Sequence, residues 1–199
     1  IGLVLTFISL AGPVQLDGNY ITLFWAAETM LLLWLSQKSG IRLMKLASVA
    51  IMALMVISLL MDWDQVYLND SDISLRIIFN KGYVTGLVAL SSVVGTFYLL
   101  KNETTEDPGK VQLYKTLLTV VGVFLLYTAQ FLELRYQLFV FELAHPAQNI
   151  IIGSYNMLFI LGLLFAQRKL TIPEVAKKLF AFWGVLAILS YLFFYHNEI

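Results

Sequence analysis

The sequence contains no cysteine among its 199 residues. This absence excludes disulfide bonds, thiolate nucleophiles and cysteine-ligated metals. Charged residues are also scarce, at 13% of the chain, whereas a soluble domain carries about 25% because its surface must be solvated. The formal net charge is zero, so the chain lacks the basic field that attracts nucleic acid. We therefore expect no nucleic-acid partner.

Motifs for nucleotide and metal chemistry are missing as well. The sequence has no phosphate-binding loop of the Walker type, no dinucleotide fingerprint and no HExxH pattern. Its two histidines, His145 and His196, do not stand at a metal-ligand spacing. We expect no cofactor, no bound metal and no ATP-driven chemistry from this segment.

Apolar residues, in contrast, make up 59% of the chain. They occur in long stretches separated by polar residues, and a membrane-spanning helix needs about 20 mostly apolar residues. The pattern predicts an all-α, polytopic transmembrane helix bundle with about seven spans, the first one truncated and ended by Gly12-Pro13. The predicted spans are residues 1–11, 20–35, 43–61, 83–100, 113–132, 150–166 and 179–195.

The first residues are apolar and include neither an initiator Met nor the basic region of a signal peptide. We interpret residues 1–199 as a single transmembrane domain that is part of a longer chain. The expected partners are membrane lipids and either other membrane subunits or the remainder of the same chain.

The basic residues alternate between the two sides of the predicted membrane. Three of the connecting regions carry ten of them: Lys38, Arg42, Lys45, Lys101, Lys110, Lys115, Arg168, Lys169, Lys177 and Lys178. The other side carries three, which are Arg76, Lys81 and Arg135. Lys and Arg are retained on the cytoplasmic side, so the asymmetry predicts a cytoplasmic N-terminus for the chain.

The two long outer loops, predicted at residues 62–82 and 133–148, contain apolar residues that a free loop does not need. Examples are Ile77, Ile78 and Phe79 in the first loop and Phe139 and Phe141 in the second. Exposing such side chains to water forfeits about 1.5–3 kcal/mol each. We expect these segments to lie on the membrane surface or to fold back and pack over the bundle.

Glu28 is the most informative residue, because it is acidic and lies within a predicted span. It stands eight residues after Tyr20, about 12 Å along a helix and close to the middle of a hydrocarbon core about 30 Å thick. A carboxylate there costs several kcal/mol unless it is protonated, paired or hydrated. Glu28 is therefore either a proton or substrate site or a structural hydrogen bond between helices.

No residue on the same helix face is able to pair with Glu28, so its partner must come from another element. The cations on the predicted outer side are Lys81, Arg76 and Arg135. Lys81 is the first candidate because its long side chain stands at the start of a span, and Arg76 is the second. Close to the same helix, Asp17 or Asn19 is expected to cap its first turn, with Gly18 making the turn.

Two segments resemble a known family. Leu16-Asp17-Gly18-Asn19-Tyr20-Ile21-Thr22-Leu23-Phe24-Trp25-Ala26-Ala27-Glu28 and Phe79-Asn80-Lys81-Gly82-Tyr83-Val84-Thr85-Gly86-Leu87 are similar to segments of a large bacterial family of predicted multi-spanning membrane proteins, classified only as a domain of unknown function. The resemblance implies a multi-pass protein of the bacterial cytoplasmic membrane and carries over no activity. It also implies an outward-facing cluster made of Asp17, Trp25, Glu28, Asn80 and Lys81.

Three classes of function remain open. The chain is a transport-type module with Glu28 in a cavity open to the outside, or a scaffold subunit of a bacterial envelope complex. The alternative is a membrane-embedded transferase acting on a lipid-linked substrate, with Asp17 in its first outer loop. Scaffold and transport are favoured over the enzyme, because no acid–base pair of convincing spacing appears.

The predicted orientation is testable by single-cysteine labelling, since the chain has no native cysteine. We expect Asn69→Cys and Ala144→Cys to react with an impermeant maleimide in intact cells. Ser39→Cys, Thr105→Cys and Thr171→Cys should react only after the membrane is permeabilised. Labelling of Thr105→Cys together with protection of Asn69→Cys in intact cells would reverse the orientation.

Overall fold

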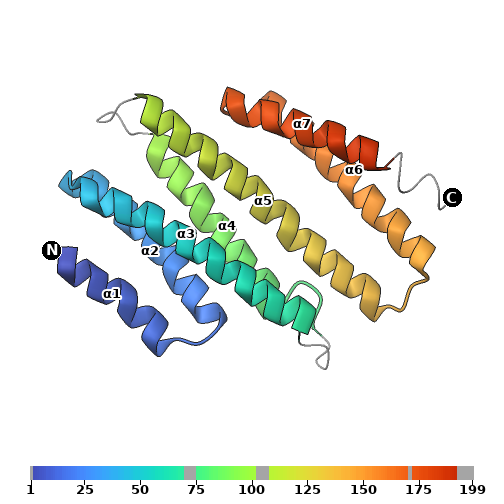
Figure 1. The fold of residues 1–199 in the computed structure, drawn as a ribbon, viewed down its shortest axis with the longest axis horizontal. Coiled ribbons are helices and arrows are strands. Elements are labelled where there is room, and N and C mark those ends of the chain that lie inside the picture. The colour runs from blue at the N-terminus through green and yellow to red at the C-terminus, as the bar shows by residue number, and fades with distance from the viewer. Residues whose placement is uncertain (1, 70–74, 102–107, 170–171, 192–199) are drawn as a thin grey trace. The chain divides into compact units, whose positions relative to one another are not determined.

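The computed structural model describes residues 2–69, 75–101, 108–169 and 172–191, and the regular structure in these ranges is helical (Figure 1). The α-helices are α1 (Gly2–Gln15), α2 (Asn19–Ser39), α3 (Arg42–Asp64), α4 (Lys81–Lys101), α5 (Pro108–Val140), α6 (His145–Lys169) and α7 (Glu174–Ser190). A short π-helix, η1 (Gln65–Asn69), follows α3 directly. The chain forms two compact units, Ile1–Val111 and Gln112–Ile199.

Four of the described helices are long and apolar enough to cross a membrane. They are α3 continued through η1 to Leu68, α4, α5 and α6. Helices α1 and α7 have 14 and 17 residues and are shorter than a span, and α2 has 21 residues but a more polar composition. The all-α prediction is confirmed, whereas the count of about seven spans and the orientation stay predictions.

Two predicted helix ends are wrong. Gly12-Pro13 does not end α1, which continues to Gln15. Pro13 lacks one hydrogen-bond donor, but the Leu16 amide still bonds the Gly12 carbonyl at 2.9 Å. The turn occurs instead at Gly18, whose φ of 54° lies in the left-handed region that favours glycine. Gly18 also precedes α2 without any side-chain capping bond, so the expected cap by Asp17 or Asn19 is absent.

Helix α5 is longer than expected. It runs for 33 residues to Val140, about 50 Å, whereas the sequence predicted an end at Leu132. Glu133 lies inside the helix and is buried, and Gln137 one turn later donates to its Oε1 at 3.0 Å. A single acidic residue need not end a helix when a neighbouring side chain donates a hydrogen bond to its carboxyl. Most of the predicted second outer loop is therefore helical.

Unit 1 is arranged around α2, which contacts α1, α3 and α4. Its buried apolar residues include Leu32 and Leu33 of α2, Met55 and Leu59 of α3, and Val93 of α4. Hydroxyl groups of the neighbouring helices donate to the backbone of α2. Ser48 of α3 bonds the Thr29 carbonyl at 2.7 Å, and Ser92 of α4 bonds the Ala26 carbonyl at 2.6 Å. Small polar residues of this kind allow helices to approach closely in a membrane.

Helix α1 packs closely against α2 because of a glycine. A Cβ atom added at Gly12 would stand 2.5 Å from Cδ1 of Phe24, which is shorter than any real contact of this type. The Phe24 ring therefore lies against the bare backbone of α1. Figure 1 shows the two helices running antiparallel as a hairpin.

Unit 2 contains α5 from Gln112 onward, α6 and α7. Tyr127 of α5 donates to Oδ1 of Asn156 in α6 at 2.8 Å, and the Tyr155 hydroxyl returns a bond to the Tyr127 carbonyl at 2.9 Å. Helix α7 contacts α6 and begins at Glu174, where the Lys177 ammonium 2.7 Å away lowers the pKa of the carboxyl. The Tyr127 ring also packs against Tyr155 and Phe159 of α6, so aromatic packing and hydrogen bonds join α5 to α6.

Five apolar residues of the predicted outer loops do not pack over the helices. Phe79 is 81% exposed, Phe139 74% and Phe141 63%, and Ile77 and Ile78 are about half exposed. The expectation that they fold back onto the bundle is wrong within the described residues. Two positive φ angles at non-glycine residues, at Ile78 and Glu142, turn the backbone at these segments.

The close approach of α1 and α2 predicts that Gly12 tolerates no side chain. Gly12→Ala should lower the unfolding midpoint in detergent, because overpacking of this kind costs about 1–3 kcal/mol. The matched control is Gly162→Ala in α6, where an added Cβ meets no atom within 4 Å. That change should be neutral or stabilising by up to about 1 kcal/mol. Equal effects at both glycines would contradict the packing.

Candidate functional site

Glu28 lies midway along α2 and is 7% exposed. Ser9 of α1 donates its hydroxyl to Oε1 of this carboxyl. The contact follows from the packing at Gly12 and Phe24, because Ser9 lies one turn before Gly12 and Glu28 one turn after Phe24 on antiparallel helices. The predicted requirement for a partner on another helix is confirmed. The partner is a hydroxyl, and the expected ion pair with Lys81 or Arg76 is not formed.

Two polar atoms beside this contact have no hydrogen-bond partner among the described residues. They are Oε2 of Glu28 and Nε1 of Trp25, and both are buried. Residues three apart share one face of a helix, so an unfilled acceptor and an unfilled donor lie on the same side of α2. An unpaired buried polar group costs about 1–3 kcal/mol, and these two atoms have unfilled capacity for a proton or a polar ligand.

A second buried carboxyl lies between α2 and α3. Asp62 was predicted in an outer loop, but it stands inside α3 and is 5% exposed. Thr22 of α2 donates to its Oδ2 at 2.6 Å, and the Ser58 hydroxyl lies 2.6 Å from the Thr22 hydroxyl. Because the single hydroxyl proton of Thr22 is directed to Asp62, Ser58 is the donor to Thr22. The three side chains form a directional chain of hydrogen bonds that ends at a carboxylate.

The spacing of Ser58 and Asp62 contained a sequence signal for this second carboxyl. The two residues are four apart, so they share a helix face. A helix that continues past Met61 directs both side chains toward the same neighbouring helix. Asp62, Trp63 and Asp64 follow an apolar run, and this composition is also typical of the start of a loop. Trp63 is instead buried, and its indole donates to the Gly82 carbonyl at 3.1 Å.

Asn80 is a helix cap. Its Oδ1 accepts from the Tyr83 amide at 2.8 Å and from the Tyr67 hydroxyl at 3.1 Å, and its Nδ2 donates to the Arg76 carbonyl at 3.3 Å. These contacts begin α4 at Lys81 and hold the preceding turn. Asn80 therefore has a structural role as a helix cap, whereas the family resemblance implied only a place in an outward-facing cluster.

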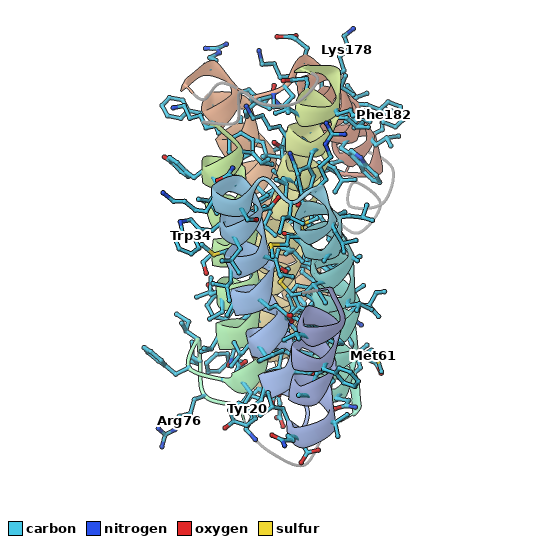
Figure 2. All side chains as sticks on the ribbon, turned by 90° about the vertical axis from the view of Figure 1, so that its left-hand side faces the viewer. Tyr20, Trp34, Met61, Arg76, Lys178 and Phe182 are labelled. Carbon is cyan, nitrogen blue, oxygen red and sulfur yellow. The ribbon has the colours of Figure 1, made fainter. Side chains whose placement is uncertain are left out.

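The remaining candidates do not gather around Glu28. Asp17 is exposed in the turn before α2, and Lys81 and Arg76 are exposed at the start of α4. Figure 2 shows Arg76 at the same end of unit 1 as Tyr20, with its side chain extending away from the helices. Arg135 belongs to unit 2, where it is exposed on α5. The functional roles predicted for these residues stay predictions.

No group of three or more His, Asp and Glu side chains in the described ranges is arranged to hold a metal ion. The chemistry available at the site is that of carboxyl and hydroxyl groups. Ser9 with Glu28 and the Ser58–Thr22–Asp62 chain both place a carboxyl at the end of a hydroxyl donor. Such arrangements bind or pass protons, and they also hold helices together.

The hydrogen bond from the Thr22 hydroxyl is predicted to stabilise the buried Asp62 carboxylate. Thr22→Val should destabilise the protein by about 1–3 kcal/mol, because the buried Asp62 carboxylate loses its donor. Thr116→Val is the control, since the Thr116 hydroxyl bonds only the Gln112 carbonyl of its own helix. In a thermal-stability cycle of Thr22→Val with Asp62→Leu, the double variant should lose less stability than the sum of the single variants. Additive effects would rule out the contact.

A comparison with known families gives a match over nearly the whole chain. A family model described as "Predicted membrane protein (DUF2339)" matches residues 1–198. No curated protein and no solved structure gives a match. The helices long enough to span a bilayer and the family match both identify a membrane protein. The chain belongs to the DUF2339 family of predicted membrane proteins.

Proposed function

We propose that the chain is a transport-type module of a bacterial cytoplasmic membrane protein, in which Glu28 is a site that binds and releases a proton. The observation that carries the proposal is the buried carboxyl of Glu28, bonded to Ser9 through one oxygen and unpaired at the other. Intramembrane carboxyls are rare and costly, and they mark proton relays and substrate pathways.

The unpaired atoms favour transport over a scaffold. A carboxyl that only holds two helices together gains most when all its acceptor positions are filled, because each unfilled one costs free energy in a low-dielectric interior. Here Oε2 of Glu28 and the Trp25 indole both remain unpaired among the described residues. This arrangement leaves capacity for a proton on the carboxyl and for a polar group of a substrate beside it.

The Ser58–Thr22–Asp62 chain adds support, because Thr22 belongs to the same helix as Glu28. Thr22 precedes Glu28 by six residues, about 9 Å along the helix axis, toward the end that begins at Asn19. In the predicted orientation this end faces outward. The transferase alternative lacks such support, since no contact joins the Asp17 carboxyl to another described side chain.

Modification by dicyclohexylcarbodiimide tests whether Glu28 carries an exchangeable proton, because this apolar reagent reacts with protonated carboxyls at membrane depth. We expect mass spectrometry of the treated, reconstituted protein to find the adduct on Glu28. The yield should fall as the pH of the medium is raised, since the protonated fraction falls. Glu28→Gln should abolish the adduct, and Glu133→Gln, which changes a buried carboxyl of α5, should leave it unchanged.

Proton flux into proteoliposomes provides the functional readout. With a potassium gradient and valinomycin, a dye in the lumen should report acidification several-fold faster for the unmodified chain than for Glu28→Gln. The rate for Glu133→Gln should match that of the unmodified chain. If Glu28 shows no adduct and all three proteins acidify at the rate of empty liposomes, Glu28 is a structural group and the scaffold assignment replaces this one.

A further inference from the structure

The segment 75–80, which precedes helix α4, carries three large apolar side chains that are exposed. Ile77 is 56% exposed, Ile78 49% and Phe79 81%. They are flanked on one side by Arg76 and on the other, after the cap residue Asn80, by Lys81, and both basic side chains are exposed. A short apolar turn between two cations is thus presented away from the helices of unit 1.

The backbone holds this turn in a strained conformation. Ile78 has a φ of 67°, which is a genuine outlier for a β-branched residue. The Phe79 amide bonds the Ile77 carbonyl at 2.7 Å, closing a three-residue turn of the rare type with positive φ. Strain of this kind persists where the surrounding structure determines it and often accompanies function. Here the strained residue lies between two other exposed apolar residues, Ile77 and Phe79.

The position of the turn along the membrane normal follows from α4. This helix is a candidate span of 21 residues, Lys81–Lys101, about 31 Å long, and a hydrocarbon core is about 30 Å thick. As a span, α4 places its two ends at the two membrane interfaces. Phe79 precedes the first residue of the span by two positions, so the turn lies at the level where acyl chains meet headgroups.

We propose that the segment Arg76–Lys81 is a lipid-binding wedge, in which Ile77, Ile78 and Phe79 enter the acyl boundary while Arg76 and Lys81 contact the phosphates of anionic lipids. Apolar residues buried at the interface and basic side chains reaching lipid headgroups are the two contributions that drive such binding. The occupant is a lipid surface, because the cations flank the apolar tip on both sides and match an anionic layer above an apolar one. The inference is independent of the role assigned to Glu28.

Site-directed spin labelling of the reconstituted chain tests the depth of the turn, since the sequence has no native cysteine. A nitroxide on Phe79→Cys should be accessible to oxygen and shielded from a water-soluble nickel chelate. Val94→Cys, exposed on the middle of α4, is the reference for acyl depth, and a water-soluble nitroxide free in the buffer is the aqueous reference. Accessibility to nickel equal to that of the free nitroxide would overturn the proposal, as would shielding from both reagents, which would mean that protein covers the turn.

Lipid composition tests the role of the cations. The Phe79→Cys label should lie deeper in vesicles of phosphatidylcholine with phosphatidylglycerol than in phosphatidylcholine alone. Arg76→Gln with Lys81→Gln should abolish this difference, whereas Lys38→Gln with Lys101→Gln, which removes two charges at the other ends of α2 and α4, should preserve it. Each variant is compared only after its unfolding midpoint matches that of the parent. A depth that does not depend on phosphatidylglycerol in the parent would overturn the proposed contact with anionic lipids.

Discussion

The arrangement of unit 1 depends on one constraint: α2 carries polar groups that are buried among the helices, where water does not solvate them. Buried polar groups need hydrogen-bond partners within the protein, and α2 contains Thr22, Trp25, Glu28 and Thr29 in two turns. Ser9 of α1 bonds Glu28, the Ser58–Asp62 pair of α3 bonds Thr22, and Ser48 and Ser92 donate to backbone carbonyls of α2. An apolar helix in the same place would need none of these contacts. The polarity of α2 therefore accounts for its central position.

In the described residues of unit 1, the buried carboxyls of Glu28 and Asp62 accept hydrogen bonds from hydroxyl groups and form no ion pair with a basic side chain. A buried ion pair is costly to desolvate on both sides, and its attraction repays this only with excellent geometry. A hydroxyl donor adds no second charge and allows the carboxyl to change its protonation state without leaving an unpaired cation. Glu28 with Ser9 and Asp62 with Thr22 both follow this pattern. The basic residues Arg76 and Lys81 remain exposed at the helix end, where they are available to lipid phosphates.

Close contacts at small residues make these partnerships possible. Gly12 brings the backbone of α1 against the Phe24 ring, and Gly95 of α4 lies so close to α2 that an added Cβ would stand 2.4 Å from Cε of Met30. The helix separations are short enough for serine and threonine side chains to reach across. At the end of the unit, the Tyr67 hydroxyl donates to the side chain of Asn80 at the start of α4. The side-chain amide of Asn19 donates to the Thr85 hydroxyl at 3.3 Å. These contacts hold the turn that presents Phe79.

The sequence by itself determined the helical class, the membrane environment, the turn at Gly18 and the isolation of Glu28 from any partner on its own helix, because these follow from local composition and from spacing along one helix. It did not determine that α5 continues through Glu133, since that depends on Gln137 satisfying the carboxyl. Nor did it identify Ser9, or the pairing of Thr22 with Asp62, as partners of buried groups. Such contacts depend on how closely two helices approach and on their relative rotation. Only the tertiary structure decided that Glu28 meets a hydroxyl and that Lys81 stays at the surface.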